Sequence, residues 1–129
     1  MKFLGIGNDI IEIQRVRDVL KRQGKSFMKR VLTPQEEMYC LEHQDPDPHV
    51  AARFSVKESV VKALGCGIGK EVRWHDIEIV RDSKGKPQAV LSEHVRKKFN
   101  HPVIHISISH CKNYVATVAL IYENTPLTF

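Results

Sequence analysis

Two carboxylates and a lysine have the residue types and the spacing that phosphate chemistry needs. Glu58 and Lys62 stand one helical turn apart in a predicted helix. Asp9 lies in an alternating stretch whose nearby glycines, Gly5 and Gly7, are expected to leave space beside its carboxylate. Mg²⁺ takes one or two carboxylates, and substrate phosphates and water complete its octahedron. Asp9 and Glu58 could supply these ligands, and Lys62 could stabilise charge on a transferring phosphoryl group.

The same residues also have plainer explanations. Glu58 and Lys62 could form only an ion pair on a partly solvated helix face, and Asp9 could be a turn residue at the end of a strand. His105 could contact a ligand phosphate or be a hydrogen-bonded residue of a sheet. A zinc site is not expected, because the seven histidines form no HxH or HExxH pattern. No GxSxG motif or activated cysteine indicates a nucleophile.

The stretch from residue 51 to residue 69 is the element that must position this chemistry. Its good helix formers and its very wide apolar arc predict a mostly buried helix. Arg53 and Lys57 fall inside the apolar arc, so both cations are expected to have buried partners. Ser55 and Ser59 fall on the opposite, polar side, together with the carboxylate and the lysine described above.

A glycine-rich loop is predicted directly after this helix. Gly65 is expected to end the helix, and Gly67 and Gly69 follow at alternate positions. Such a loop carries little side chain and lets a backbone approach a ligand closely. The loop alone is a weak indication, but beside a charged, buried helix it suggests a phosphate site.

The remaining pattern predicts helices and strands in one domain that spans residues 1–129. Helices are expected from residue 13 to Gly24, at 26–32, from the Thr33 cap to about His43, and from the Ser92 cap to about Asn100, with a break at 45–48 before the central helix. Strands are expected at 3–11, 76–80, 88–91, 103–110 and 114–122, the last two as a tight antiparallel hairpin.

The distribution of charge indicates an acidic partner. The net charge of +5 lies entirely in the first 32 residues, and the rest of the chain is neutral. A nucleic acid, an anionic membrane surface or an acidic protein would fit this basic segment. The three cysteines show no paired spacing, and no leader or membrane-length apolar run is visible. A reduced, cytoplasmic location is expected.

Two blocks of the sequence resemble the phosphopantetheinyl transferases in their short, single-domain form. The blocks are GIGNDIIEIQRV at 5–16 and RFSVKESVVKALG at 53–65. Further support comes from GCGIG at 65–69, GKP at 85–87 and HISISHCKNYVA at 105–116. The similarity covers essentially the whole chain. One departure is Cys66, where the family usually has Thr, which puts a hydroxyl contact to phosphate in doubt.

The resemblance implies transfer of the 4′-phosphopantetheine arm of coenzyme A to a serine of apo acyl carrier protein, for fatty acid biosynthesis. It implies Mg²⁺, or Mn²⁺, on Asp9 and Glu58, with Lys62 neutralising the phosphate or the leaving group. Glu58 or Lys62 would be the general base. It also implies an α+β fold, with an antiparallel sheet packed against the long buried helix, and a homotrimer whose active sites are shared between subunits. The residues expected around coenzyme A are Arg53, Gly65, Gly67, Lys84, Gly85, Lys86, Pro87 and His105.

The basic N-terminal segment fits an acidic carrier protein. Docking is expected on Arg15, Arg22 and Arg30, most of it on the helix that also carries Arg17 and Lys21. A competing interpretation is a small basic nucleic-acid-binding module. That interpretation is disfavoured because the segment lacks interleaved aromatic residues and because a buried Glu58 would serve no purpose there. We therefore expect neither a nucleic acid nor a membrane as partner.

Overall fold

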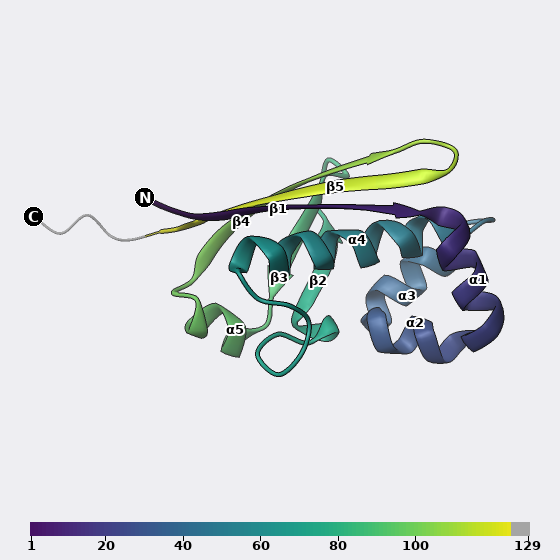
Figure 1. Cartoon of the computed structure of the whole chain (residues 1–129), viewed down its shortest axis with the longest axis horizontal. Coiled ribbons are helices and arrows are strands. Elements are labelled where there is room, and N and C mark those ends of the chain that lie inside the picture. The colour runs from purple at the N-terminus through teal and green to yellow at the C-terminus, as the bar shows by residue number, and fades with distance from the viewer. Residues whose placement is uncertain (125–129) are drawn as a thin grey trace, which may run out of the picture.

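A long helix packed against a three-stranded antiparallel sheet forms the centre of the molecule (Figure 1). The computed structural model describes residues 1–124. The sheet has the order β1-β5-β4, with β1 at Lys2–Glu12, β5 at Tyr114–Glu123 and β4 at Pro102–His110. The helix, α4 (Asp47–Leu64), runs along one face of this sheet. The predicted α+β architecture and the 103–122 hairpin are confirmed.

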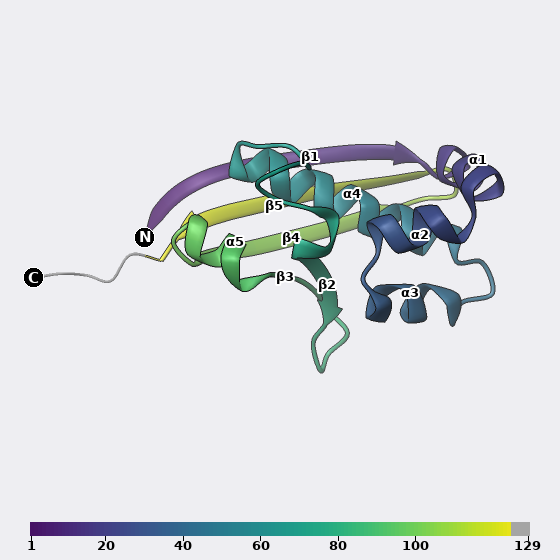
Figure 2. The same cartoon turned by 90° about the horizontal axis from the view of Figure 1, so that it is seen from below.

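Shorter elements close the two ends of α4. The helices α1 (Ile13–Gln23), α2 (Lys25–Val31) and α3 (Pro34–Leu41) gather at the end far from the chain termini (Figure 1). A 3₁₀ turn, η1 (Trp74–Asp76), leads into a separate hairpin of β2 (Ile77–Arg81) and β3 (Pro87–Leu91), which projects from the body in Figure 2. The helix α5 (Glu93–Lys98) precedes β4. Within residues 1–124, none of the helices has the length and apolar composition that crossing a bilayer requires.

Most helix ends follow the predicted capping chemistry, with three differences. Thr33 and Glu36 form the expected capping box at the start of α3, which ends at Leu41 rather than near His43. The helix α4 begins at Asp47, not near Ala51, because proline is tolerated in the first turn of a helix. Ser92 stands at the N-cap of α5, but its hydroxyl donates to Asp76 Oδ1 at 2.8 Å and does not cap the helix.

The glycines of β1 serve close packing rather than leaving an open space, so that prediction is wrong. A Cβ atom added at Gly7 would lie 2.1 Å from the carbonyl oxygen of Ser59, and one at Gly5 would lie 2.1 Å from that of Ala63. The backbone of α4 fills the space that the missing side chains leave. Asp9, two residues further along the same strand face, is thereby held close to the helix.

The predicted polar side of α4 is also wrong at its two serines. Ser55 and Ser59 are fully buried, because the sheet covers this side of the helix as well. Their hydroxyls lie 2.8 Å and 2.6 Å from the hydroxyl of Thr117 on β5. Small hydroxyl side chains can be buried at low cost when they satisfy one another, so a serine stripe marks a helix face against a sheet here.

The outer face of the sheet carries exposed apolar side chains. Ile6 and Ile10 on β1 are 61% and 68% exposed, and Leu120 on β5 is 36% exposed. A bulge between Phe3 and Gly5 shifts the register, and Phe3 is 58% exposed rather than aligned with the inner face. Isolated exposed apolar residues are ordinary, but a cluster on one sheet face is typical of an interaction surface.

Candidate active site

Asp9, Glu58 and Lys62, which the sequence alone does not bring together, meet at the contact between β1 and α4. The Lys62 ammonium donates to Asp9 Oδ1 at 3.3 Å and to the Asn8 carbonyl oxygen at 3.0 Å. Lys62 is therefore paired with the strand carboxylate, rather than in a simple pair with Glu58. Asp9 and Glu58 both line a cavity of about 230 Å³. The close packing at Gly7 makes this meeting possible, since α4 could not otherwise approach β1.

The two carboxylates have the properties of a cation site. Asp9 Oδ2 is buried and finds no hydrogen-bond donor among residues 1–124. A buried acceptor without a partner is costly, and a bound cation would remove that cost. Burial and then the neighbouring charge of Asp9 raise the pKa of Glu58, while Lys62 opposes the shift. Within the described residues no third carboxylate, histidine or cysteine joins them. Two carboxylates suit Mg²⁺ whose other ligands are phosphates and water.

An aromatic and aliphatic wall continues from the carboxylates toward α2. Phe27 and Val19 line both the carboxylate cavity and a neighbouring hollow of about 260 Å³ that reaches Arg30 and Trp74. Phe54 stacks on Trp74 with ring centroids 5.0 Å apart and on Phe27 at 6.2 Å. This wall was not predicted. The sequence feature that could have indicated the wall is Phe54, which stands one helical turn before Glu58 on the same side of α4.

Lys57, the neighbour of Glu58, has a different role. Its ammonium is fully buried and donates to the Val31 carbonyl at 2.6 Å, to Glu36 Oε1 at 2.7 Å and to the Trp74 carbonyl at 3.1 Å. An ammonium has three protons, so these acceptors satisfy it completely. Burial lowers the pKa of Lys57, and Glu36 opposes that shift. The prediction of buried partners is confirmed for this residue, which joins α4 to the α2–α3 junction.

A second, basic cavity of about 680 Å³ opens beside the first turns of α4. Arg53 is 3% exposed and its guanidinium stacks on Tyr39 with 4.1 Å between the guanidinium carbon and the ring centroid. Its Nε is buried without an acceptor in the part of the chain that the structure describes. The cationic and histidine residues that line this cavity are Arg17, His43, His49, Arg53, Arg81, His110 and Lys112. Their combined character favours an anionic ligand.

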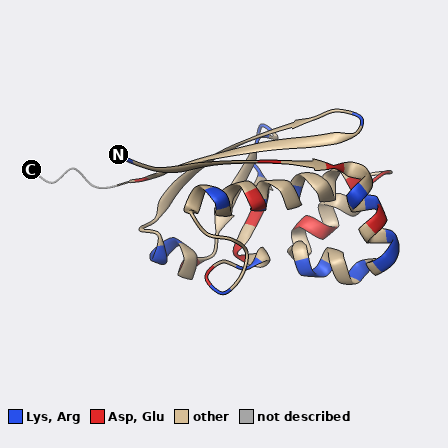
Figure 3. Ribbon diagram, viewed as in Figure 1, with Lys and Arg blue, Asp and Glu red and all other residues tan. Residues whose placement is uncertain are grey.

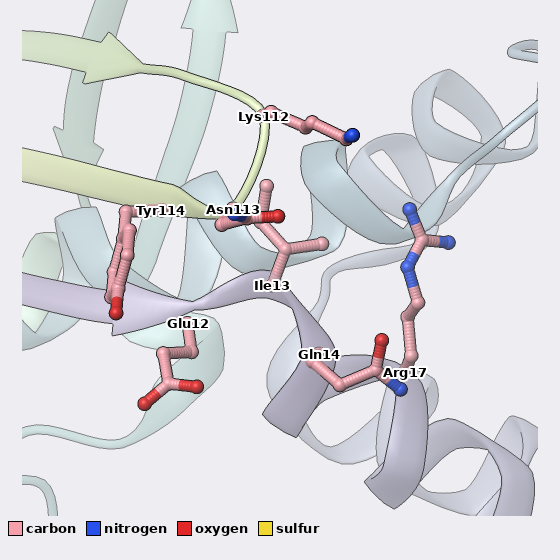
Figure 4. A pocket seen from close by; sticks show the side chains of 7 residues that line it. All are labelled: Glu12, Ile13, Gln14, Arg17, Lys112, Asn113 and Tyr114. Carbon is pink, nitrogen blue, oxygen red and sulfur yellow. The ribbon is translucent and has the colours of Figure 1, made fainter.

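The basic cavity continues into a hollow of about 370 Å³ where β1 meets α1. Figure 4 shows Arg17 and Lys112 pointing toward the same space from α1 and from the β4–β5 turn. Arg17 is held there by Asp45 at 2.7 Å and by Asp47 at 2.9 Å. Arg17 is therefore an internal ion-pair partner and is not free for a docking partner, in contrast to what its place on the basic helix suggested.

One chain does not bring the predicted coenzyme A residues together. Arg53 and Pro87 line the basic cavity, whereas Lys84, Gly85 and Lys86 form the exposed turn between β2 and β3. His105 lies on the exposed outer face of the sheet and its Nε2 is 3.0 Å from the Tyr122 hydroxyl.

The glycine loop lies at the opposite end of α4 from the basic cavity. Gly65 has the left-handed φ of +81° that ends the helix, and Gly65 and Gly67 are exposed. The C-terminal end of a helix dipole is negative, so this loop favours an anion less than the cavity beside the first turns of α4 does. Sequence reasoning missed His49, Arg81, His110 and Lys112, although His110 stands in the HISISH block.

Two of the three predicted docking residues, Arg15 and Arg30, line the cavities beside the aromatic wall. Arg15 on α1 lines the carboxylate cavity. Arg30 on α2 lines the neighbouring hollow and lies 5.8 Å from the Phe27 ring. Arg22 is an exposed residue near the end of α1. Figure 3 shows the Lys and Arg residues of α1 and α2 gathered at the end of the molecule away from the chain termini.

Comparisons with known proteins agree on one family. A family model described as the 4′-phosphopantetheinyl transferase superfamily matches residues 5–119. Among curated relatives, the holo-[acyl-carrier-protein] synthase of Protochlamydia amoebophila is 46% identical over 117 residues, which are 91% of this chain and 96% of the relative.

Solved structures of the same kind share the fold. A crystal structure of a holo-(acyl-carrier-protein) synthase from Bacillus anthracis in complex with CoA (3′,5′-ADP) matches with a TM-score of 0.83 and 35% identity, over 96% of this chain and 100% of that one. The Helicobacter pylori holo-[acyl-carrier-protein] synthase in complex with coenzyme A matches with a TM-score of 0.84 and 34% identity, over 91% of this chain and 99% of that one.

Proposed function

Because this chain belongs to the 4′-phosphopantetheinyl transferase superfamily, we propose that it transfers the 4′-phosphopantetheine arm of coenzyme A to a serine of apo acyl carrier protein. The product is a holo carrier protein for fatty acid biosynthesis, and coenzyme A is the co-substrate. The relatives named above are synthases of this kind, and two of the solved structures hold coenzyme A or part of it. They give no support to a nucleic-acid-binding module. A cytoplasmic location remains a prediction.

The observation that carries this proposal is the buried, unpartnered Asp9 Oδ2 beside Glu58 and Lys62. Asp9 and Glu58 would hold Mg²⁺, or Mn²⁺ in its place. A cation held there would supply positive charge to offset the charge of the pyrophosphate. Lys62 lies on the same side and contributes a second positive charge to the transferred phosphate or the leaving group.

Glu58 is the residue best suited to accept the proton of the carrier serine. Its side chain lines the cavity, and none of the lysines that neutralise this site is bonded to it in residues 1–124, whereas Lys62 is bonded to Asp9. Lys62 is less suited, because its ammonium already contacts Asp9 and the Asn8 carbonyl. The aromatic wall of Phe27, Phe54 and Trp74 offers an apolar surface for the arm and excludes water from the reacting atoms.

Coenzyme A would bind between two subunits of a homotrimer. The carboxylate cavity and the basic cavity share no lining residue among those described. The exposed apolar residues Ile6, Ile10 and Leu120 supply a surface for a neighbouring chain. We place the pyrophosphate at Asp9 and Glu58 of one subunit, and the phosphates of the nucleotide end near Arg53 and His110 of its neighbour. The exposed turn at Lys84–Pro87 and the residues Gly65, Gly67 and His105 remain expected contacts.

Intact-mass analysis tests the reaction. The protein is incubated with coenzyme A, Mg²⁺ and an apo carrier protein, and the carrier should gain the mass of one phosphopantetheine arm. Asp9→Asn should remove the gain, whereas Asp18→Asn, at an exposed carboxylate that accepts a hydrogen bond from Gln14, should leave it unchanged. The proposal is contradicted if several different carrier proteins all stay apo after incubation with folded wild-type protein.

Sedimentation equilibrium tests the subunit arrangement. A trimer mass is expected at the concentrations used for the transfer assay. Ile10→Glu places a charge in the exposed apolar cluster of β1 and should shift the protein toward the monomer. A wild-type protein that is monomeric while it transfers the arm rules out a site divided between subunits.

A further inference from the structure

Three buried hydroxyls join α4, which carries Glu58, to β5, the strand that pairs with β1 and its Asp9. Thr117 Oγ1 lies 2.8 Å from Ser55 Oγ and 2.6 Å from Ser59 Oγ, and all three side chains are at most 4% exposed. Ser59 Oγ also lies 3.3 Å from the Thr117 carbonyl oxygen. We call Ser55, Ser59 and Thr117 the hydroxyl cluster.

The hydroxyl cluster lies at the level of the carboxylates. Thr117 is the residue of β5 that pairs directly with Asp9 of β1. Ser59 follows Glu58 in α4, and its carbonyl oxygen faces the missing side chain of Gly7. Directly paired residues of an antiparallel sheet have Cβ atoms about 5 Å apart. The bonds between Thr117 and the two serines therefore fix the strand position of Asp9 relative to the helix position of Glu58.

The same cluster leaves Asp9 available to a cation. Its hydroxyls are engaged with one another, and none of them donates to Asp9 within residues 1–124. Asp9 Oδ2 thus keeps its lone pairs, although hydroxyl groups are buried on the adjacent strand. A hydroxyl that donated a hydrogen bond to Oδ2 would compete with a cation for that oxygen.

We propose that Ser55, Ser59 and Thr117 are positioning residues that set the separation of Asp9 and Glu58 and so determine the affinity of this pair for a divalent cation. The proposal rests on the assignment of the metal pair under the proposed function. It predicts that loss of one hydroxyl weakens metal binding even when the protein remains folded. A purely structural cluster would change the free energy of unfolding without changing the metal affinity of the folded protein.

The test measures Mn²⁺ binding by electron paramagnetic resonance on full-length variants, under conditions where thermal unfolding shows each to be folded. Thr117→Val removes the hydroxyl at constant shape, and the dissociation constant for Mn²⁺ should rise about tenfold. Thr117→Ser keeps the hydroxyl and should bind like the wild type. Ile121→Val, a buried change on the same face of β5, should lower the unfolding temperature without changing Mn²⁺ binding.

The outcomes separate this inference from the function on which it rests. If Thr117→Val binds Mn²⁺ as tightly as the wild type while Asp9→Asn has lost binding, the metal pair stands and the positioning role is overturned. If Asp9→Asn also binds Mn²⁺ like the wild type, the metal assignment is wrong, and the positioning role is overturned as well. If Thr117→Ser is as weak as Thr117→Val, the hydroxyl is not responsible, and the inference is likewise overturned.

Discussion

Lys57 and Glu58 are neighbours on α4, yet their surroundings are opposite. The Lys57 ammonium has three acceptors for its three protons and is fully buried. Glu58 is partly exposed, and its partner across the cavity, Asp9, keeps a buried oxygen without a donor. A charged side chain whose hydrogen bonds are all made holds elements together, whereas one with a free acceptor can still bind a cation. We therefore attribute stability to Lys57 and propose a chemical role for Glu58 and Asp9.

The largest effect on stability is expected at Lys57. Lys57→Met leaves the Glu36 carboxylate buried without its counter-ion and should lower the free energy of unfolding by about 3–5 kcal/mol. The double variant Lys57→Met with Glu36→Leu should recover much of this loss, because both charges of the buried pair are then removed. Urea denaturation of the single and double variants measures both effects. A single variant with the wild-type urea midpoint would show that the pair is not a structural centre.

The next largest effect is expected at Gly7, which lets β1 and its Asp9 lie close to α4. Gly7→Ala places a methyl group 2.1 Å from the Ser59 carbonyl, so β1 must move away from α4. The free energy of unfolding should fall by about 1–3 kcal/mol, and transfer should slow by about tenfold or more as Asp9 leaves Glu58. Gly69→Ala, with nothing within 4 Å of its new Cβ, is the control for stability. Unchanged transfer in Gly7→Ala would mean that this close contact does not set the site.

A smaller effect is expected on carrier binding. Arg15→Glu and Arg22→Glu reverse charge on the exposed side of α1 and should raise KM for the carrier about tenfold at low salt. KM for coenzyme A should stay nearly unchanged in Arg22→Glu, because Arg22, unlike Arg15, is not among the residues that line the carboxylate cavity. The wild-type KM for the carrier should also rise with salt, because ions screen exposed charges within about 10 Å at 0.1 M. Arg96→Glu, on α5 at the other end of the molecule, is the matched reversal. Equal KM values for the carrier in all three variants would show that α1 is only a solvated surface.

The smallest effect concerns the Arg17–Asp45 pair. A hydrogen bond from Arg17 lowers the pKa of Asp45. Since the folded-state pKa lies below that of the unfolded chain, the pair stabilises the fold at neutral pH and loses its contribution as pH falls through the folded-state pKa. Both side chains are substantially exposed, so Arg17→Ala should cost only about 0.5 kcal/mol at pH 7.

Unfolding of the wild type and of Arg17→Ala, measured between pH 7 and pH 2, checks this. The two stability curves should converge at the acid end. Arg22→Ala, on the same helix, should follow the wild-type curve throughout. Curves for the wild type and Arg17→Ala that stay parallel down to pH 2 would contradict the role given to this pair.

The sequence was sufficient for the parts of the fold that local pattern determines. Alternation predicted β4 and β5, the Thr33 capping box predicted the start of α3, and Gly65 predicted the end of α4. Helical spacing and the family resemblance single out Asp9, Glu58 and Lys62, whose chemical roles remain predictions. These inferences need only neighbours along the chain or matching motifs.

The parts that failed depend on contacts between distant segments. A helical wheel counts Ser55 and Ser59 as polar, but it contains no information about Thr117, more than fifty residues away, which satisfies both hydroxyls. Trp74 likewise reaches Phe54 only through tertiary packing. Arg17 was grouped with its basic neighbours because its acidic partners, Asp45 and Asp47, follow α3 rather than α1.

The central claim is that Asp9, whose Oδ2 is buried without a donor among residues 1–124, is kept beside Glu58 for chemistry and brings no benefit to stability. It is tested most directly by measuring the transfer rate and the free energy of unfolding of Asp9→Asn side by side, across a titration of Mg²⁺. We predict that transfer falls by about 10²–10³-fold and is not restored by excess Mg²⁺, while the free energy of unfolding stays equal to that of the wild type or rises. Near-native turnover of Asp9→Asn at any Mg²⁺ concentration would contradict the account.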